Sequence, residues 1–132
     1  REDIGKGLDR MMPRTKSRRL YAEFGDGRHN VWAEAIPAGE DLVIFIGGGE
    51  RPHVVSLSLA DAGHAPFSAS LPGHKDHLVS SKATARVSKE LGKTCVVVAG
   101  IHVEGATNSD IELLLKNSDQ CLELLIGMIK KR

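Results

Sequence analysis

Aromatic residues are scarce in this sequence, with one tryptophan, one tyrosine and three phenylalanines among 132 residues. Proteins that bind single-stranded nucleic acid commonly stack bases on aromatic side chains interleaved with basic ones, and no such pattern occurs here. An excess of one charge is lacking too, since the formal net charge is only +1. The chain as a whole therefore has no strong electrostatic preference for nucleic acid, and nucleic acid is not an expected partner.

Cysteines and long apolar runs are also few. Cys95 and Cys121 lie in apolar segments and form no C-x-x-C pair, so they are predicted to be reduced core residues of a cytoplasmic protein. No 18-residue apolar run and no secretory signal is present, so no membrane association is expected. The sequence also lacks a G-x-S-x-G elbow, and neither cysteine has a predicted base beside it, which argues against nucleophilic catalysis.

The remaining composition, 41% apolar and 27% charged, is that of an ordinary globular domain. Residues 1–16 show little hydrophobic pattern and are predicted to be a flexible N-terminal lead-in to a single domain over residues 17–132. Alternating apolar and polar residues predict a β-hairpin over 18–36 and a strand over 54–59. The short apolar runs at 42–46 and 94–101 are typical of strands buried on both faces.

Helical spacing of apolar residues begins at Leu78 and ends at Leu91, with Asp76 as the predicted N-cap. A second helical stripe runs from Ile111 to Ile129, preceded by Thr107 and Asp110 in a predicted capping box. Residues 117–118, Asn and Ser, could divide this stripe into two helices, and that alternative stays open. Residues 60–73 are expected to form a loop with a short strand near residue 67. The expected fold is α+β in two layers, a mostly antiparallel sheet with helices packed on one face.

Three histidine-bearing loops are the candidate functional site. The first, residues 47–53, places three glycines after a predicted strand, where backbone N–H groups could face an anion or simply form a flexible turn. The second, residues 73–77, precedes a helix, whose N-terminus attracts phosphate. Lys75 would add positive charge there, whereas Asp76 would compete for the same N–H donors as a cap.

The third loop, residues 99–104, places His102 at the end of a predicted strand. His53, His102 and either His74 or His77 are expected to converge at one end of the sheet. Converging imidazoles can bind a metal, perform acid–base chemistry or hold a polar ligand, and the residue types leave these three uses open. The other two histidines, at positions 29 and 64, are assigned to the surface.

The order of these motifs resembles one known family. Two glycines followed by Pro-His, then His-Lys-Asp before a helix, then A-G-I-H-V with a Thr-led helix, are similar to the LpdD-like prenylated-flavin chaperones, small subunits encoded with UbiD-type decarboxylases of hydroxybenzoate and gallate type. The resemblance spans about residues 42–130. The matching residues are Gly48, Gly49, Pro52, His53, His74, Lys75, Asp76, Ala99 to Val103, and Thr107.

This resemblance implies a non-catalytic protein that binds prenylated FMN, or FMN, and delivers it to, or protects it for, a UbiD-type decarboxylase. The implied partners are the decarboxylase catalytic subunit and a flavin prenyltransferase, and a homo-oligomer is left open. The residues implied to contact the cofactor are Gly48, Gly49, Pro52, His53, His74, Lys75, Asp76 and His102.

Two alternatives stand beside this interpretation. One is a small metal-dependent enzyme with His53, His74 and His102 as ligands and Asp76 or Glu104 as general base. The other is a non-catalytic decarboxylase subunit whose C-terminal apolar stripe, residues 114–129, docks on a partner.

Overall fold

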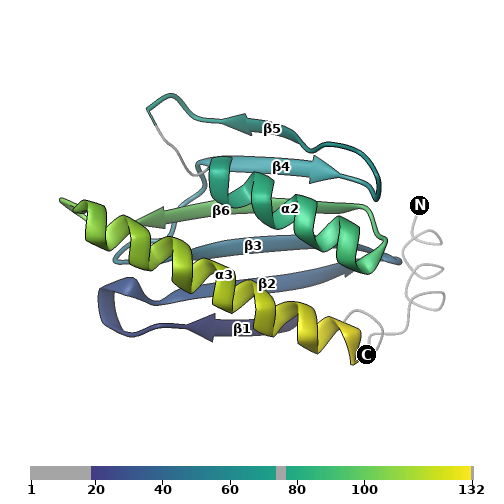
Figure 1. Ribbon diagram of the computed structural model, residues 1–132, viewed down its shortest axis with the longest axis horizontal. Helices are drawn as coiled ribbons and strands as arrows, with labels where there is room; N and C mark the ends of the chain where they lie inside the picture. The colour runs from purple at the N-terminus through teal and green to yellow at the C-terminus, as the bar shows by residue number, and fades with distance from the viewer. Residues whose placement is uncertain (1–18, 74–76, 132) are drawn as a thin grey trace, which may run out of the picture.

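The computed structural model describes residues 19–73 and 77–131 and arranges them in two layers, a sheet and a pair of α-helices (Figure 1). The predicted lead-in over residues 1–16 and the predicted N-cap at residue 76 lie outside the described residues. Along the described chain the elements are β1 (Leu20–Phe24), the 3₁₀ helix η2 (Gly27–His29), β2 (Val31–Ala38), β3 (Asp41–Gly49), β4 (Ser56–Ala60), β5 (Phe67–Ser70), α2 (His77–Leu91), β6 (Cys95–His102) and α3 (Asn108–Lys130).

The strands form one six-stranded sheet in the order β1-β2-β3-β6-β4-β5. All neighbouring strands are antiparallel except the central pair, β3 and β6, which is parallel. After β5 the chain passes through α2 and returns to the middle of the sheet, so that β6 lies between β3 and β4. The predicted α+β fold with a mostly antiparallel sheet is confirmed.

Both helices cover the same face of the sheet, α3 over β1 and β2, and α2 over β4 and β6 (Figure 1). Successive side chains of a strand point to opposite faces, and those beneath the helices are buried. Small side chains on β1 and β2 let α3 approach closely. The core residues contributed by the strands are Ala22, Val31, Ala33, Ala35, Leu42, Ile44, Ile46, Cys95, Val97 and Ala99.

The helix α3 is continuous over 23 residues, so the break left open at Asn117 and Ser118 does not occur. Both polar side chains are accommodated without one. The Asn117 amide donates to the backbone oxygen of His29 at 2.8 Å, and the Ser118 hydroxyl donates to the backbone oxygen of Leu114 at 2.8 Å. At the start of the helix, the capping box predicted from Thr107 is confirmed.

The apolar stripe of α3 packs against the sheet. Leu122, Leu125 and Ile126 are at most 3% exposed and belong to the core. The hypothesis that residues 114–129 dock on a partner protein is therefore wrong, because the domain's own sheet already covers this stripe.

The opposite face of the sheet, which we call the open face, is covered by neither helix. The prediction that residues 42–46 and 94–101 are buried on both faces is therefore wrong for this side. Ile44 and Val97, under the helices, are fully buried, but their neighbours on the open face are not. The half-buried side chains of the two central strands on this face are Val43, Phe45, Val96 and Val98.

Both cysteines are buried and free, as predicted. Burial raises the pKa of Cys95 to about 12 and that of Cys121 to about 11, so neither is a thiolate at neutral pH. No helix within residues 19–73 and 77–131 has the length and hydropathy needed to cross a membrane.

Candidate functional site

The parallel strands β3 and β6 end side by side, with Gly47–Gly49 paired to Gly100–His102. Both α-helices begin at this same end of the sheet (Figure 1). Helix N-termini carry unpaired N–H groups and the positive end of the helix dipole. In open sheets, ligands commonly bind beyond the carboxyl ends of parallel strands. This end of the domain is therefore the candidate functional site.

Glycines at this end allow the backbone to pass very close to itself. Gly49 has a φ of 74°, and a Cβ there would lie 2.3 Å from the backbone oxygen of His102. A Cβ at Gly100 would lie 1.5 Å from the backbone oxygen of His53, because the loop over residues 50–55 crosses the sheet at this point. The glycines are thus required by the packing of β3, β6 and this loop.

The backbone N–H groups that follow the glycine run are already engaged. Gly49 donates to the backbone oxygen of Asn30 at 2.9 Å. Glu50 and Arg51 both donate to the backbone oxygen of His102, at 2.7 and 3.3 Å. These three N–H groups are not available to an anion. The glycine run is therefore a hydrogen-bonded connection between strands and not a phosphate-binding loop.

His53 and His102 lie together, as their place in the two loops predicted. Their ring centroids are 5.6 Å apart and the rings are nearly perpendicular, at 74°. His102 Nε2 is 2.9 Å from Glu104 Oε2. The hydrogen bond to His102 and, next, its charge lower the pKa of the Glu104 carboxyl. This pair therefore presents imidazole and carboxylate groups at the rim of the sheet.

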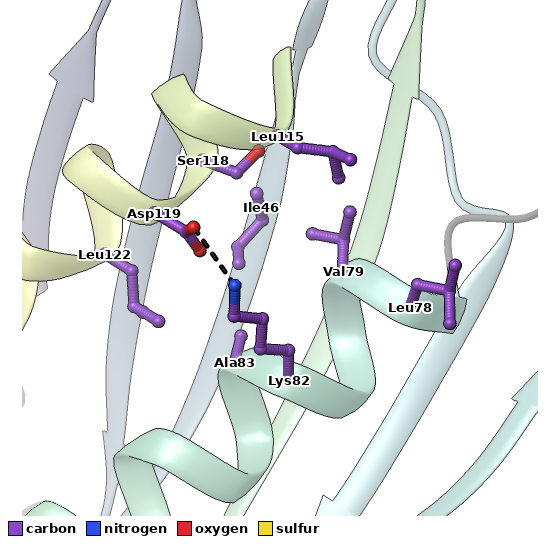
Figure 2. A pocket seen from close by; sticks show the side chains of 9 residues that line it. All are labelled: Ile46, Leu78, Val79, Lys82, Ala83, Leu115, Ser118, Asp119 and Leu122. Atoms are coloured by element: carbon purple, nitrogen blue, oxygen red, sulfur yellow. Dashed lines mark hydrogen bonds and ion pairs between the residues drawn. The ribbon is translucent and has the colours of Figure 1, made fainter. Parts of the chain in front are cut away.

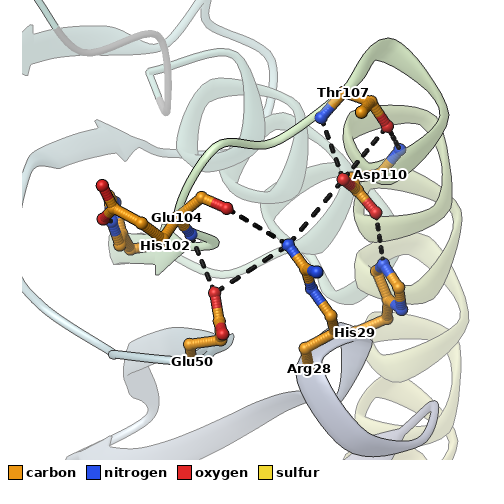
Figure 3. Close-up of polar contacts among 7 residues, drawn as sticks. All are labelled: Arg28, His29, Glu50, His102, Glu104, Thr107 and Asp110. Carbon is orange, nitrogen blue, oxygen red and sulfur yellow. Dashed lines mark hydrogen bonds and ion pairs between the residues drawn. The ribbon is translucent and has the colours of Figure 1, made fainter.

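Arg28 in η2 joins the loops at this end (Figure 3). Its guanidinium donates to the backbone oxygen of Glu104 at 3.2 Å and lies 3.9 Å from the carboxylates of both Glu50 and Asp110. Glu50 in turn accepts a hydrogen bond from the backbone N–H of Glu104 at 2.8 Å. One arginine thus ties the β3–β4 loop and the β6–α3 loop to the start of α3.

His29 also belongs to this network. Its Nε2 lies 2.7 Å from Asp110 Oδ1, and its side chain is 23% exposed, so its assignment to the surface is wrong. The backbone hydrogen bond from Thr107, then the contact with His29, hold the pKa of Asp110 at about 2. Neither His29 nor Arg28 carried a sequence signal, because their hydrogen-bond partners, Asp110 and the backbone of Glu104, lie 81 and 76 residues away. His64, by contrast, is exposed, as predicted.

A cavity of about 210 Å³ lies beside His102, between the first turns of α2 and α3. Its walls are partly polar and partly apolar. The lining residues are Gly73, Val79, Ile101, His102, Val103, Ala106, Ile111, Leu114, Leu115 and Ser118.

A second cavity, of about 160 Å³, continues between the two helices and shares Val79, Leu115 and Ser118 with the first. Ile46 of β3 lies at its base (Figure 2). Lys82 and Asp119 reach across it from opposite helices and form an ion pair at 3.1 Å. Taken together the two cavities come within the roughly 300–1,000 Å³ typical of small-molecule sites.

Only part of the second histidine loop, residues 73–77, lies within the described residues. His74, Lys75 and Asp76 lie outside the described residues, whereas Gly73 lines the cavity and His77 begins α2. Within the described residues, the buried Nδ1 of His77 has no hydrogen-bond partner.

The alternative metal site is not assembled by the described part of the chain. No three His, Cys, Asp or Glu side chains there are placed to hold a metal ion, and the third predicted ligand, His74, lies outside it.

Comparisons with known proteins agree with this picture. A model of the prenylated flavin chaperone LpdD-like domain matches residues 25–130. Protein LpdD of Lactiplantibacillus plantarum is 28% identical over 97 residues, which is 70% of this chain and 71% of that protein. A chain from the crystal structure of a chaperone complex for yeast 20S proteasome assembly has a TM-score of 0.58 at 13% identity, covering 86% of this chain and 95% of that chain. This last likeness shows a shared fold alone.

Proposed function

Because the chain belongs to the family of LpdD-like prenylated-flavin chaperones, which makes it a non-enzymatic accessory protein, we propose that it binds prenylated FMN and delivers it to, or protects it for, a UbiD-type decarboxylase. The observation that carries this proposal is the cavity beside His102, between the N-terminal turns of α2 and α3. A flavin mononucleotide joins a broad planar ring to a charged phosphate. Its site needs both apolar walls and a positive end. The cavity has apolar lining residues and lies beside the first turn of α2.

The phosphate belongs at the N-terminus of α2, because the first turn of α3 is already capped by Thr107 and Asp110. The positive end of a helix dipole and the free N–H groups of a first turn attract anions, and Lys75 would add a formal charge beside them. His74 and Asp76 belong to the same sequence segment, which joins Gly73, a lining residue of the cavity, to His77, the first residue of α2. The buried Nδ1 of His77, which has no partner within the described residues, would be satisfied by a polar group of the ligand. FMN would engage the same phosphate contacts.

The ring belongs in the groove between the helices, where Val79 and Leu115 line both cavities. His102 and, beyond it, His53 would face the polar edge of the ring, with Gly48, Gly49 and Pro52 fixing the loop that carries His53. A reactive reduced flavin needs shielding from solvent more than it needs a nucleophile. The apolar side chains of Val79 and Leu115, which line both cavities, suit that role.

Binding is tested by anaerobic titration of the protein with reduced prenylated FMN, and separately with FMN, followed by absorbance and fluorescence. Lys75→Ala is expected to weaken binding by about 1–3 kcal/mol, the range for a hydrogen bond to a charged group. The control is Lys89→Ala, an exposed lysine in the last turn of the same helix, which should bind like the wild type. Absence of bound flavin in the anaerobic wild-type protein would refute the proposal.

The location of the ring is tested by filling the groove. Leu115 is 43% exposed and lines both cavities, whereas Leu124, 48% exposed on the same helix, lines neither. Leu115→Trp should abolish flavin binding, and Leu124→Trp should not. Loss in both variants, or in neither, would place the flavin elsewhere.

Delivery is tested with apo-decarboxylase. Flavin-loaded protein should restore decarboxylase activity faster than the same amount of free cofactor, and the Leu115→Trp variant should give no acceleration. Equal rates with loaded protein and with free cofactor would leave binding intact but remove the delivery role.

A further inference from the structure

The open face of the sheet carries a continuous apolar surface. Strand register places Ile36, Val43, Val96, Leu59 and Phe67 in one row across five strands. In the adjacent row, Phe45, Val98 and Leu57 lie side by side at the centre. An apolar surface that spans a whole sheet is far larger than the scattered apolar residues of an ordinary protein surface.

The exposure of this surface is unusual in degree. Leu57, Leu59 and Phe67 are 39%, 46% and 69% exposed. Charged side chains lie at its margin, where Arg19 pairs with Glu34 of β2 at 3.6 Å, Glu23 stands on β1 and the exposed Asp41 begins β3. At the centre the side chains that share the strand register carry no charge: Val43, Phe45, Val96, Val98 and Leu57. Depletion of charge at the centre with a polar rim is the composition of a buried protein interface.

We propose that the open face packs against the open face of a second copy of this chain, sheet on sheet. A six-stranded sheet with strands about 4.8 Å apart, and five or six residues of each strand at about 3.3 Å per residue, offers on the order of 480–570 Å² per copy. The total for two copies, about 1,000 Å², reaches the lower size expected of a specific interface. One sheet covered by helices on a single face is half of a sandwich, and a second pleated face is the surface that fits it. Self-association does not depend on flavin binding, so its test is separate from the tests of the proposed function.

Two leucines of equal exposure provide the test. Leu57 at the centre of the open face and Leu113 on the outer side of α3 are each 39% exposed. In sedimentation velocity over about 1–100 µM protein, wild type and Leu113→Lys should form dimers, and Leu57→Lys should remain monomeric. A monomeric wild type across that range, or equal behaviour of the two variants, would overturn the proposal. Circular dichroism confirms that each variant is folded.

The single tryptophan gives a second readout that requires no variant. Trp32 lies on the open face, stacked on Phe45 with ring centroids 5.2 Å apart. Dissociation exposes this indole to water, so dilution of the wild-type protein should shift its emission to longer wavelength, with the midpoint at the dissociation constant found by sedimentation. Emission that stays constant while the sedimenting mass falls would place the interface away from the open face.

Discussion

The two faces of the sheet are made by the same strands, yet they differ in what covers them. Val97 and Val98 are neighbours in β6, and the first is fully buried under the helices while the second is half-buried on the open face. The apolar content of a strand therefore does not reveal whether the layer that packs on it belongs to the same chain. Burial of the face beneath the helices stabilises the fold, whereas the apolar side chains of the open face remain available for association.

The covered face is itself divided. Beneath α3 most of the buried side chains are apolar, but beneath α2 they include a buried set of hydroxyl groups. Ser80 lies 3.1 Å from Ser56 Oγ and 2.9 Å from Ser58 Oγ, and the Thr84 hydroxyl donates to the backbone oxygen of Ser58 at 3.0 Å. The half of the domain that adjoins the proposed flavin groove is therefore held more by directional hydrogen bonds.

The largest expected difference is between the two neighbouring valines. Val97→Ala should lower the free energy of unfolding by about 2–3 kcal/mol, because it leaves a cavity in the core. Val98→Ala should lower it by less than about 1 kcal/mol when the protein is dilute enough to be monomeric, because water already reaches this site. Urea denaturation of both variants at low concentration measures the difference. Equal effects would mean that the two faces do not differ in the monomer.

Next in size is the effect of the hydroxyl cluster. Ser80→Ala should destabilise the protein by about 1–3 kcal/mol, because it leaves the buried Ser56 hydroxyl without its partner. The double variant Ser56→Ala with Ser80→Ala should be destabilised by less than the sum of the two single changes, because no orphaned hydroxyl remains at that contact. Strict additivity in a denaturation cycle would show that the two groups do not interact.

The smallest expected effect is the pH dependence from Asp110. Its carboxyl has a pKa of about 2 in the folded protein against an ordinary value of 3.8. Because the pKa is lower in the folded protein than in the unfolded chain, the ionised carboxylate stabilises the fold at pH values above the ordinary pKa. This contribution is lost as the pH falls from about 4 toward 2. The Asp110→Asn variant should therefore show a shallower fall of Tm over that range. An unchanged slope would exclude Asp110 as a source of acid sensitivity.

Much of the fold could be predicted from periodicity alone. The hairpin, both central strands, the crossover helix and the capping box at Thr107 all follow from local patterns that the tertiary structure preserves. The break considered at Asn117 and Ser118 failed for a tertiary reason, because Asn117 finds its acceptor at His29 in a turn 88 residues away. The prediction that β3 and β6 are buried on both faces was wrong, because an apolar sequence pattern indicates only that burial is favourable. It does not indicate which chain provides the layer that covers the strand.

The candidate site was predictable where its residues end consecutive elements of the sheet. His53 and His102 meet because the strands before them are bound together by the sheet topology. Arg28 was not predictable, since its three acidic or carbonyl partners lie on two loops and the first turn of α3, which no local pattern links. The anion-binding interpretation of the glycine run could not be decided from sequence either, because only the fold shows that its N–H groups are already engaged.

The insertion of β6 between β3 and β4 has a consequence for how the domain folds. The meander β1–β3 and the hairpin β4–β5 each pair locally, but they share no hydrogen bonds with one another. Leu42 must find Cys95, 53 positions later, before the two parts become one sheet. Pairings of such long range form slowly. Two unpaired inner edges, those of β3 and β4, therefore persist until β6 arrives, so the late arrival of this strand is the step at which the chain is most open to aggregation.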